Sequence, residues 1–455
     1  MAREDGRDAM TGKWFFLLDT VVFFGITWGT LYLRHGGLKW PQFRDQLYVY
    51  IPIFLLTSFM LWLFSFYDVH LLKKQIIAYK RLIIAWLLTI MGSASVIYFS
   101  YALSIHLPTP RRILIVILLF YFAYIYAVRR NYFKLDVAKT NVLVFGTSPT
   151  IIELVKLMRE SRGYRIKEKA EVPLSDKKYN LKHIDIVIVG SKLFRENPQA
   201  WDVITRQFIA RGACVDTDFN AFEYVSQRVS RESVEDSMWL LRGIGNRHQN
   251  GMYTMLKRVI DVGFSVVMLP VLVPLGLLIW LAIRIIDGCN PIFSQKRVGY
   301  FGKEFVMYKF RTITPSTQES ERETITKTGN FLRRFRLDEI PQIINVLKGE
   351  LSLVGPRPLW VGEYTILNEN IPNHNIRTIA KPGITGWAQL NFKAPPNYKT
   401  KNGNKELAEK AAFEGAFTRF SYDVWYIKNA SIMLDIEILV KTGLRMFIKD
   451  SHVAE

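Results

Sequence analysis

Long apolar runs constrain this chain more than any other feature of its sequence. Each of the four early runs has roughly 16 to 22 residues, and a helix needs about 20 to cross the hydrocarbon core of a bilayer. We therefore expect four membrane-spanning helices in a domain of residues 1–134, although the last run is also short enough for a buried soluble helix. The runs cover residues 14–32, 48–66, 82–103 and 113–128.

Basic residues flank these runs unevenly, which predicts their orientation. They precede the first run, separate the second from the third and follow the fourth: Arg3, Arg7, Lys13, Lys73, Lys74, Lys80, Arg81, Arg129, Arg130 and Lys134. Because positive charge favours the cytoplasmic side, we expect both termini inside. The first 13 residues are charged and no small-residue cleavage site follows them, so the first helix is expected to be a retained anchor.

Short apolar strands alternate with polar helices between residues 135 and 250. Residues 141–146 and 183–191 have the composition of β-strands, which predicts a small Rossmann-like α/β domain with a parallel sheet. The first strand-to-helix turn keeps only Gly146 of a Gly-x-Gly-x-x-Gly fingerprint, and Pro149 stands where the chain would approach a pyrophosphate. For this α/β domain, a structural or regulatory role is therefore favoured over the binding of a dinucleotide.

A fifth apolar segment, residues 259–286, contains Pro270 and Pro274. Two prolines four residues apart remove backbone donors and break the helical hydrogen-bond ladder. A fifth crossing would also place everything after residue 286 outside the cell if the N-terminus is inside. We therefore expect a re-entrant helix–break–helix over about residues 257–286, at the start of a cytosolic domain of residues 251–455.

Charge and cysteine content narrow the classes of partner. The formal net charge of +20 fits phosphate groups on nucleic acid, anionic lipid or nucleotides. A nucleic-acid protein is disfavoured, because the basic residues flank apolar runs and carboxylates and no recognition motif is present. The only cysteines, Cys214 and Cys289, lack metal-ligand spacing, so neither a zinc site nor a disulfide framework is expected.

Residues 329–359 are rich in glycine, proline, arginine and carboxylate side chains, and they include the adjacent pair Asp338 and Glu339. Adjacent side chains on a helix point about 100° apart, so the two carboxylates cannot serve the same atom. One can attack a phosphorus atom while its neighbour holds a divalent cation. Arg333 and Arg357 offer bidentate donors to phosphate oxygens. On residue types alone, a salt-bridged surface helix followed by a Pro-rich turn is an equal alternative.

Six motifs occur in order between residues 257 and 387. They are Lys257-Arg258 with Asp261, Gln-x-Arg-Val-Gly at 295–299, Lys-Phe-Arg-Thr at 309–312, Leu-Asp-Glu-x-Pro-Gln at 337–342, Ser-Leu-Val-Gly-Pro-Arg-Pro at 352–358 and Lys-Pro-Gly-Ile-Thr-Gly-Trp at 381–387. With these motifs the chain resembles the bacterial sugar transferases, the monotopic polyprenyl-phosphate glycosyl-1-phosphate transferases. Large members of that family also carry four membrane helices and a small α/β domain ahead of a mostly helical catalytic domain. One departure is Val273 before Pro274, where the family often has serine.

The resemblance implies roles for individual residues. Asp338 would be the nucleophile, Glu339 the Mg²⁺ ligand, and Arg333 and Arg357 would stabilise phosphate. Further substrate contacts are expected from residues of the motifs: Gln295, Arg297, Lys309, Arg311, Gln342 and Lys381. The reaction would be ping-pong, with a covalent aspartyl-phosphosugar intermediate.

The implied function is transfer of hexose-1-phosphate from a UDP-sugar to undecaprenyl phosphate at the bacterial inner membrane, giving undecaprenyl-diphospho-sugar and UMP. This would be the first membrane step of exopolysaccharide, capsule or O-antigen synthesis. Glucose or galactose is the expected sugar, and membrane lipids and a second copy of the chain are expected partners. The alternative is a membrane-anchored nucleotide-binding regulator of glycan assembly; a transporter is disfavoured because the apolar runs contain few polar residues.

Two further segments near the C-terminus have weaker signals. Residues 391–404 have the composition of a loop that could close over a substrate. Residues 435–447 space apolar side chains at helical intervals, so Lys441 and Arg445 could face lipid headgroups, with core packing as an equal alternative.

Overall fold

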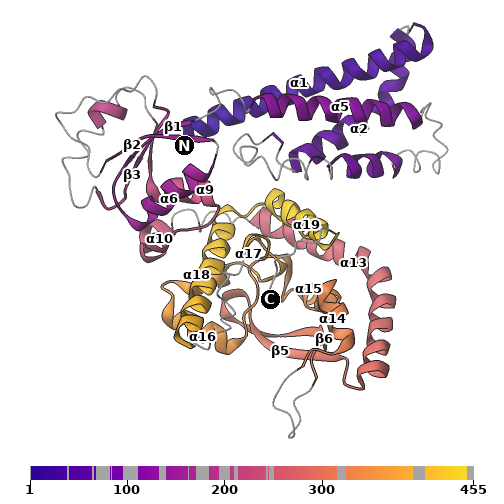
Figure 1. Ribbon diagram of the computed structural model, residues 1–455. Coiled ribbons are helices and arrows are strands. Elements are labelled where there is room, and N and C mark those ends of the chain that lie inside the picture. Colours follow the sequence, from indigo (N-terminus) through magenta and orange to yellow (C-terminus); the bar gives the residue numbers. More distant parts are fainter. Residues whose placement is uncertain are drawn as a thin grey trace. The chain divides into compact units, whose positions relative to one another are not determined.

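The computed structural model describes residues 2–37, 40–63, 66–67, 82, 85–95, 111–132, 140–161, 163–170, 184–193, 205–209, 214–241, 244, 251–314, 324–392 and 405–447. The chain folds into two compact units, Met1–Ala221 and Phe222–Glu455 (Figure 1). Each unit is described by itself below.

The described N-terminal region is helical. It contains α1 (Ala2–His35), α2 (Trp40–Leu63), the segment Ala85–Ser95 and α5 (Arg111–Tyr132). Aromatic side chains join these helices: the ring of Phe23 lies 5.1 Å from that of Phe54 on α2 and 5.1 Å from that of Tyr121 on α5. In this region Lys13–Leu33 is long and apolar enough to span a membrane, whereas Val49–Trp62, Ala85–Ser95 and Ile113–Val128 are apolar but shorter. Four spanning helices therefore stay a prediction.

A four-stranded parallel sheet follows, as the sequence predicts. Its strands are β1 (Thr140–Phe145), β2 (Tyr164–Ala170), β3 (Ile186–Val189) and β4 (Cys214–Thr217), in the order β2-β1-β3-β4. Helix α6 (Pro149–Glu160) starts directly after β1, because Ser148 caps it by accepting from the Ile151 amide and Pro149 fits the first helical turn. Buried side chains of Phe145, Val187 and Phe208 fill one core of this sheet. Two helices flank β4 in the sequence: the π-helix η3 (Thr205–Ile209) precedes it and α9 (Asp218–Ser226) follows it.

Two short helices near the start of the C-terminal unit pack on its core. These are α10 (Arg231–Glu235) and α11 (Ser237–Leu241). Val229, Val234 and Leu240 are buried in the same hydrophobic cluster as residues of the C-terminal helices. By these contacts, residues 229–241 belong to the C-terminal unit.

Helix α13 (Gly251–Ala282) continues into the π-helix η4 (Ile283–Asp287), and together they form the second segment long and apolar enough to span a membrane. Pro270 and Pro274 lie inside α13, and Figure 1 shows the helix bending rather than running straight. Helical conformation nevertheless continues through both prolines. The structure thus has a bent helix where the sequence suggested a break, and its return to the same membrane face stays a prediction.

An antiparallel hairpin and three short helices follow. The hairpin pairs β5 (Ile292–Val298) with β6 (Glu304–Phe310), and then come α14 (Lys327–Arg334), the 3-10 helix η6 (Leu337–Gln342) and α15 (Ile343–Lys348). The other described elements of this unit are η5 (Tyr300–Gly302), β7 (Ser352–Val354), α16 (Val361–Asn370), η7 (His374–Ile379), β8 (Gly383–Thr385), α17 (Trp387–Asn391), α18 (Lys405–Asn429) and α19 (Ile432–Phe447).

Two of the sequence motifs meet in the parallel pair β7–β8. The Gly355 amide donates to the Thr385 carbonyl over 2.8 Å, and the Gly383 amide donates to the Pro356 carbonyl over 2.9 Å. A Cβ atom on Gly355 would lie 2.2 Å from the Lys381 carbonyl oxygen. The two backbones approach so closely that only glycine fits there.

The two weaker C-terminal predictions have different outcomes. Residues 393–404, most of the predicted loop, lie outside the described residues. Helix α19 is present, and Leu434 and Ile438 at its N-terminal half are buried in the main core. Lys441 pairs with Glu437, and Arg445 donates to the Leu390 carbonyl over 2.9 Å. Both basic side chains therefore make protein contacts, which favours the core-packing interpretation.

Candidate functional site

The adjacent carboxylates Asp338 and Glu339 lie in the first turn of η6. The preceding residue, Arg336, adopts a left-handed conformation with φ +53°, which ends the α14 segment and redirects the chain. Leu337 and Ile340 pack on a cluster built by α13, β6 and α14, so both carboxylates stay half-buried at its edge. The sequence argument assumed an α-helix here. A 3-10 helix turns about 120° per residue, so the two side chains still point in different directions.

Lys309 on β6 is brought directly to this turn. Its Nζ lies 3.1 Å from Glu339 Oε1, and both side chains are largely shielded, with 17% and 16% of their surface exposed. The other oxygen of Glu339 has no partner among the described residues. The structure therefore joins two residues that the sequence proposed separately, one as a substrate contact and one as a metal ligand.

Arg333 reaches the same region from the end of α14. Its Nε donates to Thr312 Oγ1 over 2.9 Å, and Thr312 lies two residues after the end of β6. Gly329 makes this approach possible, because a Cβ there would lie 2.3 Å from the Thr312 carbonyl oxygen. Lys309, Thr312, Arg333, Asp338 and Glu339 are thus placed by contacts among β6, α14 and η6, and we call them the carboxylate cluster.

Two other predicted residues near this cluster have structural partners. Arg311 donates through Nε to the Asn290 carbonyl over 2.9 Å and lies over the Phe293 ring at 5.7 Å. Gln342 is buried at the end of η6. Both positions support the hairpin and η6, and direct substrate contact by either residue stays a prediction.

Gln295, Arg297 and Arg357 form a second group on β5 and the loop after β7. Arg297 donates to Gln295 Oε1 over 2.7 Å and to the Pro358 carbonyl over 3.3 Å. Burial, and then the neighbouring charge of Arg357, lowers the pKa of the Arg297 guanidinium. Arg357 itself is exposed and lines a small hollow with Gly299 and Thr378. The described lining of that hollow does not include Asp338.

Lys381 belongs to a third group, at the start of α13. It lines a cavity together with Lys257 and Arg258, and that lining likewise does not include Asp338. By the contacts of the described residues, the residues predicted from the sequence fall into three groups. Asp338, Glu339, Arg333 and Lys309 lie in the first, Gln295, Arg297 and Arg357 in the second, and Lys381 in the third.

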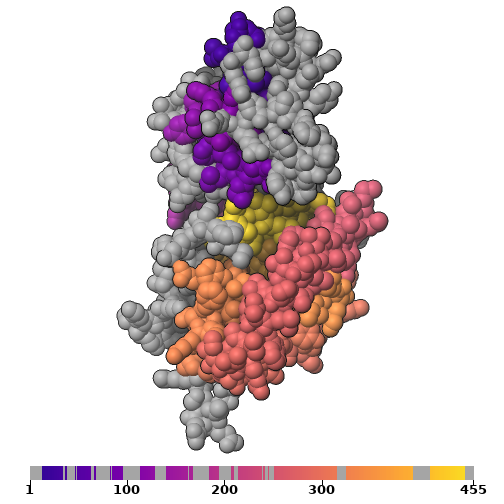
Figure 2. Space-filling model, turned by 90° about the vertical axis from the view of Figure 1, so that its right-hand side faces the viewer, coloured from indigo at the N-terminus to yellow at the C-terminus, as the bar shows by residue number. Residues whose placement is uncertain are grey.

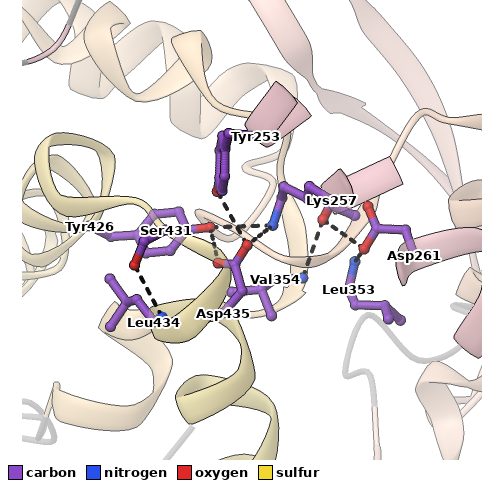
Figure 3. Close-up of polar contacts among 10 residues, drawn as sticks. Tyr253, Lys257, Asp261, Leu353, Val354, Tyr426, Ser431, Leu434 and Asp435 are labelled. Atoms are coloured by element: carbon purple, nitrogen blue, oxygen red, sulfur yellow. Dashed lines mark hydrogen bonds and ion pairs between the residues drawn. The ribbon is translucent and has the colours of Figure 1, made fainter. Parts of the chain in front are cut away.

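A buried polar network anchors α13 to the core beside Lys381 (Figure 3). Asp435 on α19 accepts from Lys257 Nζ over 2.7 Å and from the Tyr426 hydroxyl over 2.6 Å. Asp261 accepts from the Leu353 amide over 3.0 Å. Part of this network is visible in the sequence, since Lys257 and Asp261 are spaced four residues apart on one helical face, whereas no sequence pattern indicated Asp435 or Tyr426.

The α/β domain offers a different candidate site, at the carboxyl ends of its strands. In such sheets ligands bind where the strand order reverses, here beside β1 and β3. That position is filled by Asp218, which is 1% exposed. Its carboxylate accepts from the Ser191 amide over 2.9 Å and from Ser148 Oγ over 3.1 Å, and burial raises its pKa. The donors that would hold a phosphate are therefore taken by the chain itself.

The residues fit a divalent cation only as a sparse site. Among the described residues, no three His, Cys, Asp or Glu side chains gather into a metal-binding group. Mg²⁺ usually keeps several waters and takes one or two carboxylates together with substrate phosphates. The free oxygen of Glu339 beside Asp338 matches that donor set.

Comparisons with known proteins find similar sequences. A model of the family "Bacterial sugar transferase" matches residues 252–449. The sugar transferase EpsL of Bacillus subtilis is 34% identical over 200 residues, which are 43% of this chain and 89% of that protein. The UDP-glucose:undecaprenyl-phosphate glucose-1-phosphate transferase of Escherichia coli is 36% identical over 208 residues, 44% of this chain and 42% of the relative.

A third relative differs in the sugar that its name gives. The UDP-N-acetylgalactosamine-undecaprenyl-phosphate N-acetylgalactosaminephosphotransferase of Aeromonas hydrophila is 31% identical over 206 residues, 44% of this chain and 45% of the relative. This chain therefore matches less than half of the length of the Escherichia coli and Aeromonas proteins.

Proposed function

Because this chain belongs to the bacterial sugar transferase family, we propose that it transfers hexose-1-phosphate from a UDP-sugar to undecaprenyl phosphate, releasing UMP. The carboxylate cluster is the observation that carries the proposal. It combines Asp338, which is the proposed nucleophile, a second carboxylate with one oxygen that has no partner among the described residues, and two cationic side chains around one turn.

In the first half-reaction, an Asp338 carboxylate oxygen forms a bond to the β-phosphorus of the UDP-sugar. The bond from that phosphorus to the bridging oxygen breaks, and UMP leaves with the electron pair. Arg333 and Lys309 lie where they can stabilise negative charge on the phosphoryl oxygens. Glu339 would hold Mg²⁺, which when bound neutralises charge on the diphosphate.

In the second half-reaction, an oxygen of undecaprenyl phosphate forms a bond to the same phosphorus, and the Asp338 carboxylate leaves. The product is undecaprenyl-diphospho-sugar, and the bond between the sugar and its phosphate stays intact. We propose glucose or galactose as the sugar and exopolysaccharide, capsule or O-antigen synthesis as the pathway. Relatives whose names specify glucose, galactose and N-acetylgalactosamine are similar to this chain over 43–44% of its length.

We also propose that the protein works at the bacterial inner membrane as a multi-pass protein with its catalytic part in the cytosol. Support comes from the exposed apolar surface of α13 and from the two segments long enough to span a bilayer. Dimerisation stays a prediction from the sequence.

The alternative, a nucleotide-binding regulator, has less support. It needs a ligand site in the α/β domain, but the buried carboxylate of Asp218 takes the donors at the position where a phosphate would bind. The negative charges of the Asp218 carboxylate and of a bound phosphate would also repel each other. The regulator interpretation would gain support only if the protein bound a nucleotide without using Asp338.

The test measures UMP release by purified full-length protein with Mg²⁺, undecaprenyl phosphate and each of several UDP-sugars. We expect release with one sugar or few, and a loss of about 10³-fold or more in Asp338→Asn. Glu369→Gln on α16 makes the same carboxyl-to-amide change at an exposed position and should retain activity. If folded wild type releases UMP from none of the sugars, the proposal is wrong.

A further inference from the structure

Trp360, the residue directly before α16, is an exposed aromatic side chain that the carboxylate cluster does not use. It is 45% exposed. Its ring packs over Gly362, where a Cβ atom would lie 1.9 Å from a ring carbon. The ring is therefore held against the start of α16 while much of it stays open to solvent. A fixed, exposed indole ring offers a flat surface on which another planar group can stack.

The backbone pairing of Trp360 decides which way its side chain points. Trp360 forms an antiparallel bridge with Arg297 on β5, and the Val298 amide beside it donates to the Leu359 carbonyl over 2.9 Å. Residues directly opposite each other in antiparallel strands have their side chains on the same face. Trp360 and Arg297 are therefore neighbours on one face of this strand pair.

The same face leads along the β5–β6 hairpin to the carboxylate cluster. Side chains two residues apart on a strand share a face, so Phe293, Gln295 and Arg297 lie on it together. Lys309 stands directly opposite Phe293 and shares that face too. Its Nζ contacts Glu339 in the cluster. Gln295 and Arg297 are only half-buried, so the face is partly open along β5.

The length of this face fits a nucleoside diphosphate. Four residues of β5 separate Phe293, opposite Lys309, from Arg297, opposite Trp360. At ~3.3 Å per residue this is ~13 Å along the strand. An extended nucleoside diphosphate spans a comparable distance from its base to its β-phosphorus. A donor whose β-phosphoryl group lies between Lys309 and Asp338 can therefore place its base at Trp360.

Positive charge gathers beside Trp360. Burial, and then the charge of Arg357, lowers the pKa of Arg297, and Glu363 opposes this effect only as the smallest of the three causes. The Nε of Arg297 is buried and has no hydrogen-bond partner among the described residues. A phosphoryl group near both guanidinium groups would offset their repulsion and accept hydrogen bonds from them.

The lipid acceptor has a different surface from which to reach the cluster. Val267 and Leu278 on α13 are 67% and 66% exposed, and Figure 2 shows this helix lying open along one face of the C-terminal unit. A Cβ atom on Gly276 of α13 would lie 3.9 Å from Ile340 of η6. The apolar surface of α13 thus adjoins the turn that carries Asp338, and an acceptor held in the bilayer does not need the hairpin face.

We propose that the base of the nucleotide donor stacks on Trp360, while Arg297 and Arg357 bind the phosphoryl group next to the ribose. This assignment rests on the proposed function, in which the donor is a UDP-sugar. It gives Trp360, which lies outside the six sequence motifs, a role in binding the donor and none in the chemical step.

The kinetic test uses the ping-pong mechanism, in which kcat/KM for each substrate reports only the half-reaction of that substrate. Trp360→Leu removes the ring but keeps an apolar side chain, whereas Trp360→Phe keeps a ring. Ile366→Ala, which shortens an exposed apolar side chain on α16, is the control.

We expect Trp360→Leu to lower kcat/KM for the UDP-sugar roughly tenfold or more, with kcat/KM for an isoprenyl phosphate within about twofold of wild type. Trp360→Phe and Ile366→Ala should stay within about threefold for both substrates. An unchanged kcat/KM for the UDP-sugar in Trp360→Leu, or equal losses for the two substrates, would overturn the assignment.

A binding measurement distinguishes failure of this inference from failure of the proposed function. Calorimetric titration of full-length protein in detergent with Mg²⁺ compares UDP with inorganic pyrophosphate, which has no base. We expect Trp360→Leu to bind UDP roughly tenfold more weakly than wild type and pyrophosphate equally well. If the wild type releases no UMP from any UDP-sugar, the proposed function fails and this titration alone decides the inference. Equal affinity of Trp360→Leu and wild type for UDP, or a wild type that binds UDP no more tightly than pyrophosphate, contradicts a base site at Trp360.

Discussion

Two lysines of the β5–β6 hairpin pair with glutamates in very different surroundings, one with Glu339 on η6 and one with Glu304 on the hairpin itself. Lys309 and Glu339 are 3.1 Å apart and mostly shielded. Lys296 and Glu304 are 3.5 Å apart with 73% and 47% of their side chains exposed. Water and salt screen an exposed pair, so it contributes about 0–1 kcal/mol, whereas removing one partner of a shielded pair leaves an uncompensated charge. The burial of each pair, more than the distance between its charges, therefore decides which lysine has a large effect when it is removed.

We expect Lys309→Ala to lower kcat/KM for the UDP-sugar by about 10- to 100-fold, because one charge-assisted contact contributes roughly 1.5–3 kcal/mol. Lys296→Ala is the matched control and should stay within about twofold. The measurement is steady-state kinetics, repeated for Glu339→Gln and for the double variant. If Lys309 acts by positioning Glu339, the double variant loses less than the sum of the single losses. Equal effects of the two alanine variants would contradict this role.

His374 links single-residue burial to the pH dependence of stability. It is 1% exposed, its ring lies between Tyr364 and Phe420, and Nδ1 has no hydrogen-bond partner among the described residues. Burial, and then the charge of Arg377, lowers its pKa to about 3. Between pH 3 and 6.5 only the unfolded state binds the proton. The free energy of unfolding therefore falls as the pH decreases below 6.5.

At pH 5 this loss amounts to about 2 kcal/mol. Phenylalanine cannot take the proton, so we expect His374→Phe to show a smaller loss of stability between pH 7.5 and pH 5, by about that amount. Denaturant unfolding of both proteins in the same detergent at both pH values measures the difference. Identical pH dependence would show that His374 does not titrate as its burial predicts.

At the scale of elements, local sequence patterns located the candidate reactive residues but not the contacts between segments that position them. The parallel sheet, the apolar helix with two prolines and the Asp338–Glu339 pair were all visible as local patterns. That two motifs pair as β7–β8, or that Lys309 meets Glu339, depends on contacts between segments 30 residues apart. Local periodicity and propensity carry no information on such pairings. The sequence also did not predict that η6 is a 3-10 helix. Arg336, the residue before it, has a left-handed conformation, and no glycine marks that position in the sequence.

Glycine at the β7–β8 contact should be indispensable. We expect Gly355→Ala to destabilise the protein by about 3 kcal/mol or more, since its Cβ would lie 2.2 Å from the Lys381 carbonyl oxygen and backbone cannot yield easily. Gly443→Ala on α19 meets nothing within 4 Å and should be neutral or stabilising by up to about 1 kcal/mol. Thermal unfolding midpoints compare the two variants. A Gly355→Ala protein as stable as wild type would mean that the strands do not pack so closely.

At the scale of the whole molecule, the course of α13 decides where the catalytic residues stand. A helix of this length can cross a bilayer, and a helix bent at Pro270 and Pro274 can return to the side it entered. The two cases differ in one observable. If α13 returns, residues before it and after it share a compartment; if it crosses, they do not.

The two native cysteines stand on either side of α13 and allow a direct test. Cys214 lies on β4 and Cys289 lies two residues after η4, and both are half-buried. In a cysteine-free background, single cysteines at position 214, at position 289 and at the exposed Ser294 (Ser294→Cys) are treated with a membrane-impermeant maleimide. Ser104→Cys, in the loop expected outside between the third and fourth apolar runs, is the external control.

We expect intact spheroplasts to label only the cysteine at position 104, and permeabilised cells to label all four. Re-entry of α13 keeps positions 289 and 294 in the cytosol with position 214, where Asp338 has access to UDP-sugars. Labelling of positions 289 and 294 in intact spheroplasts, with position 214 protected, would show that α13 crosses the membrane. The carboxylate cluster would then face away from cytosolic nucleotides, and the proposed donor could not reach it.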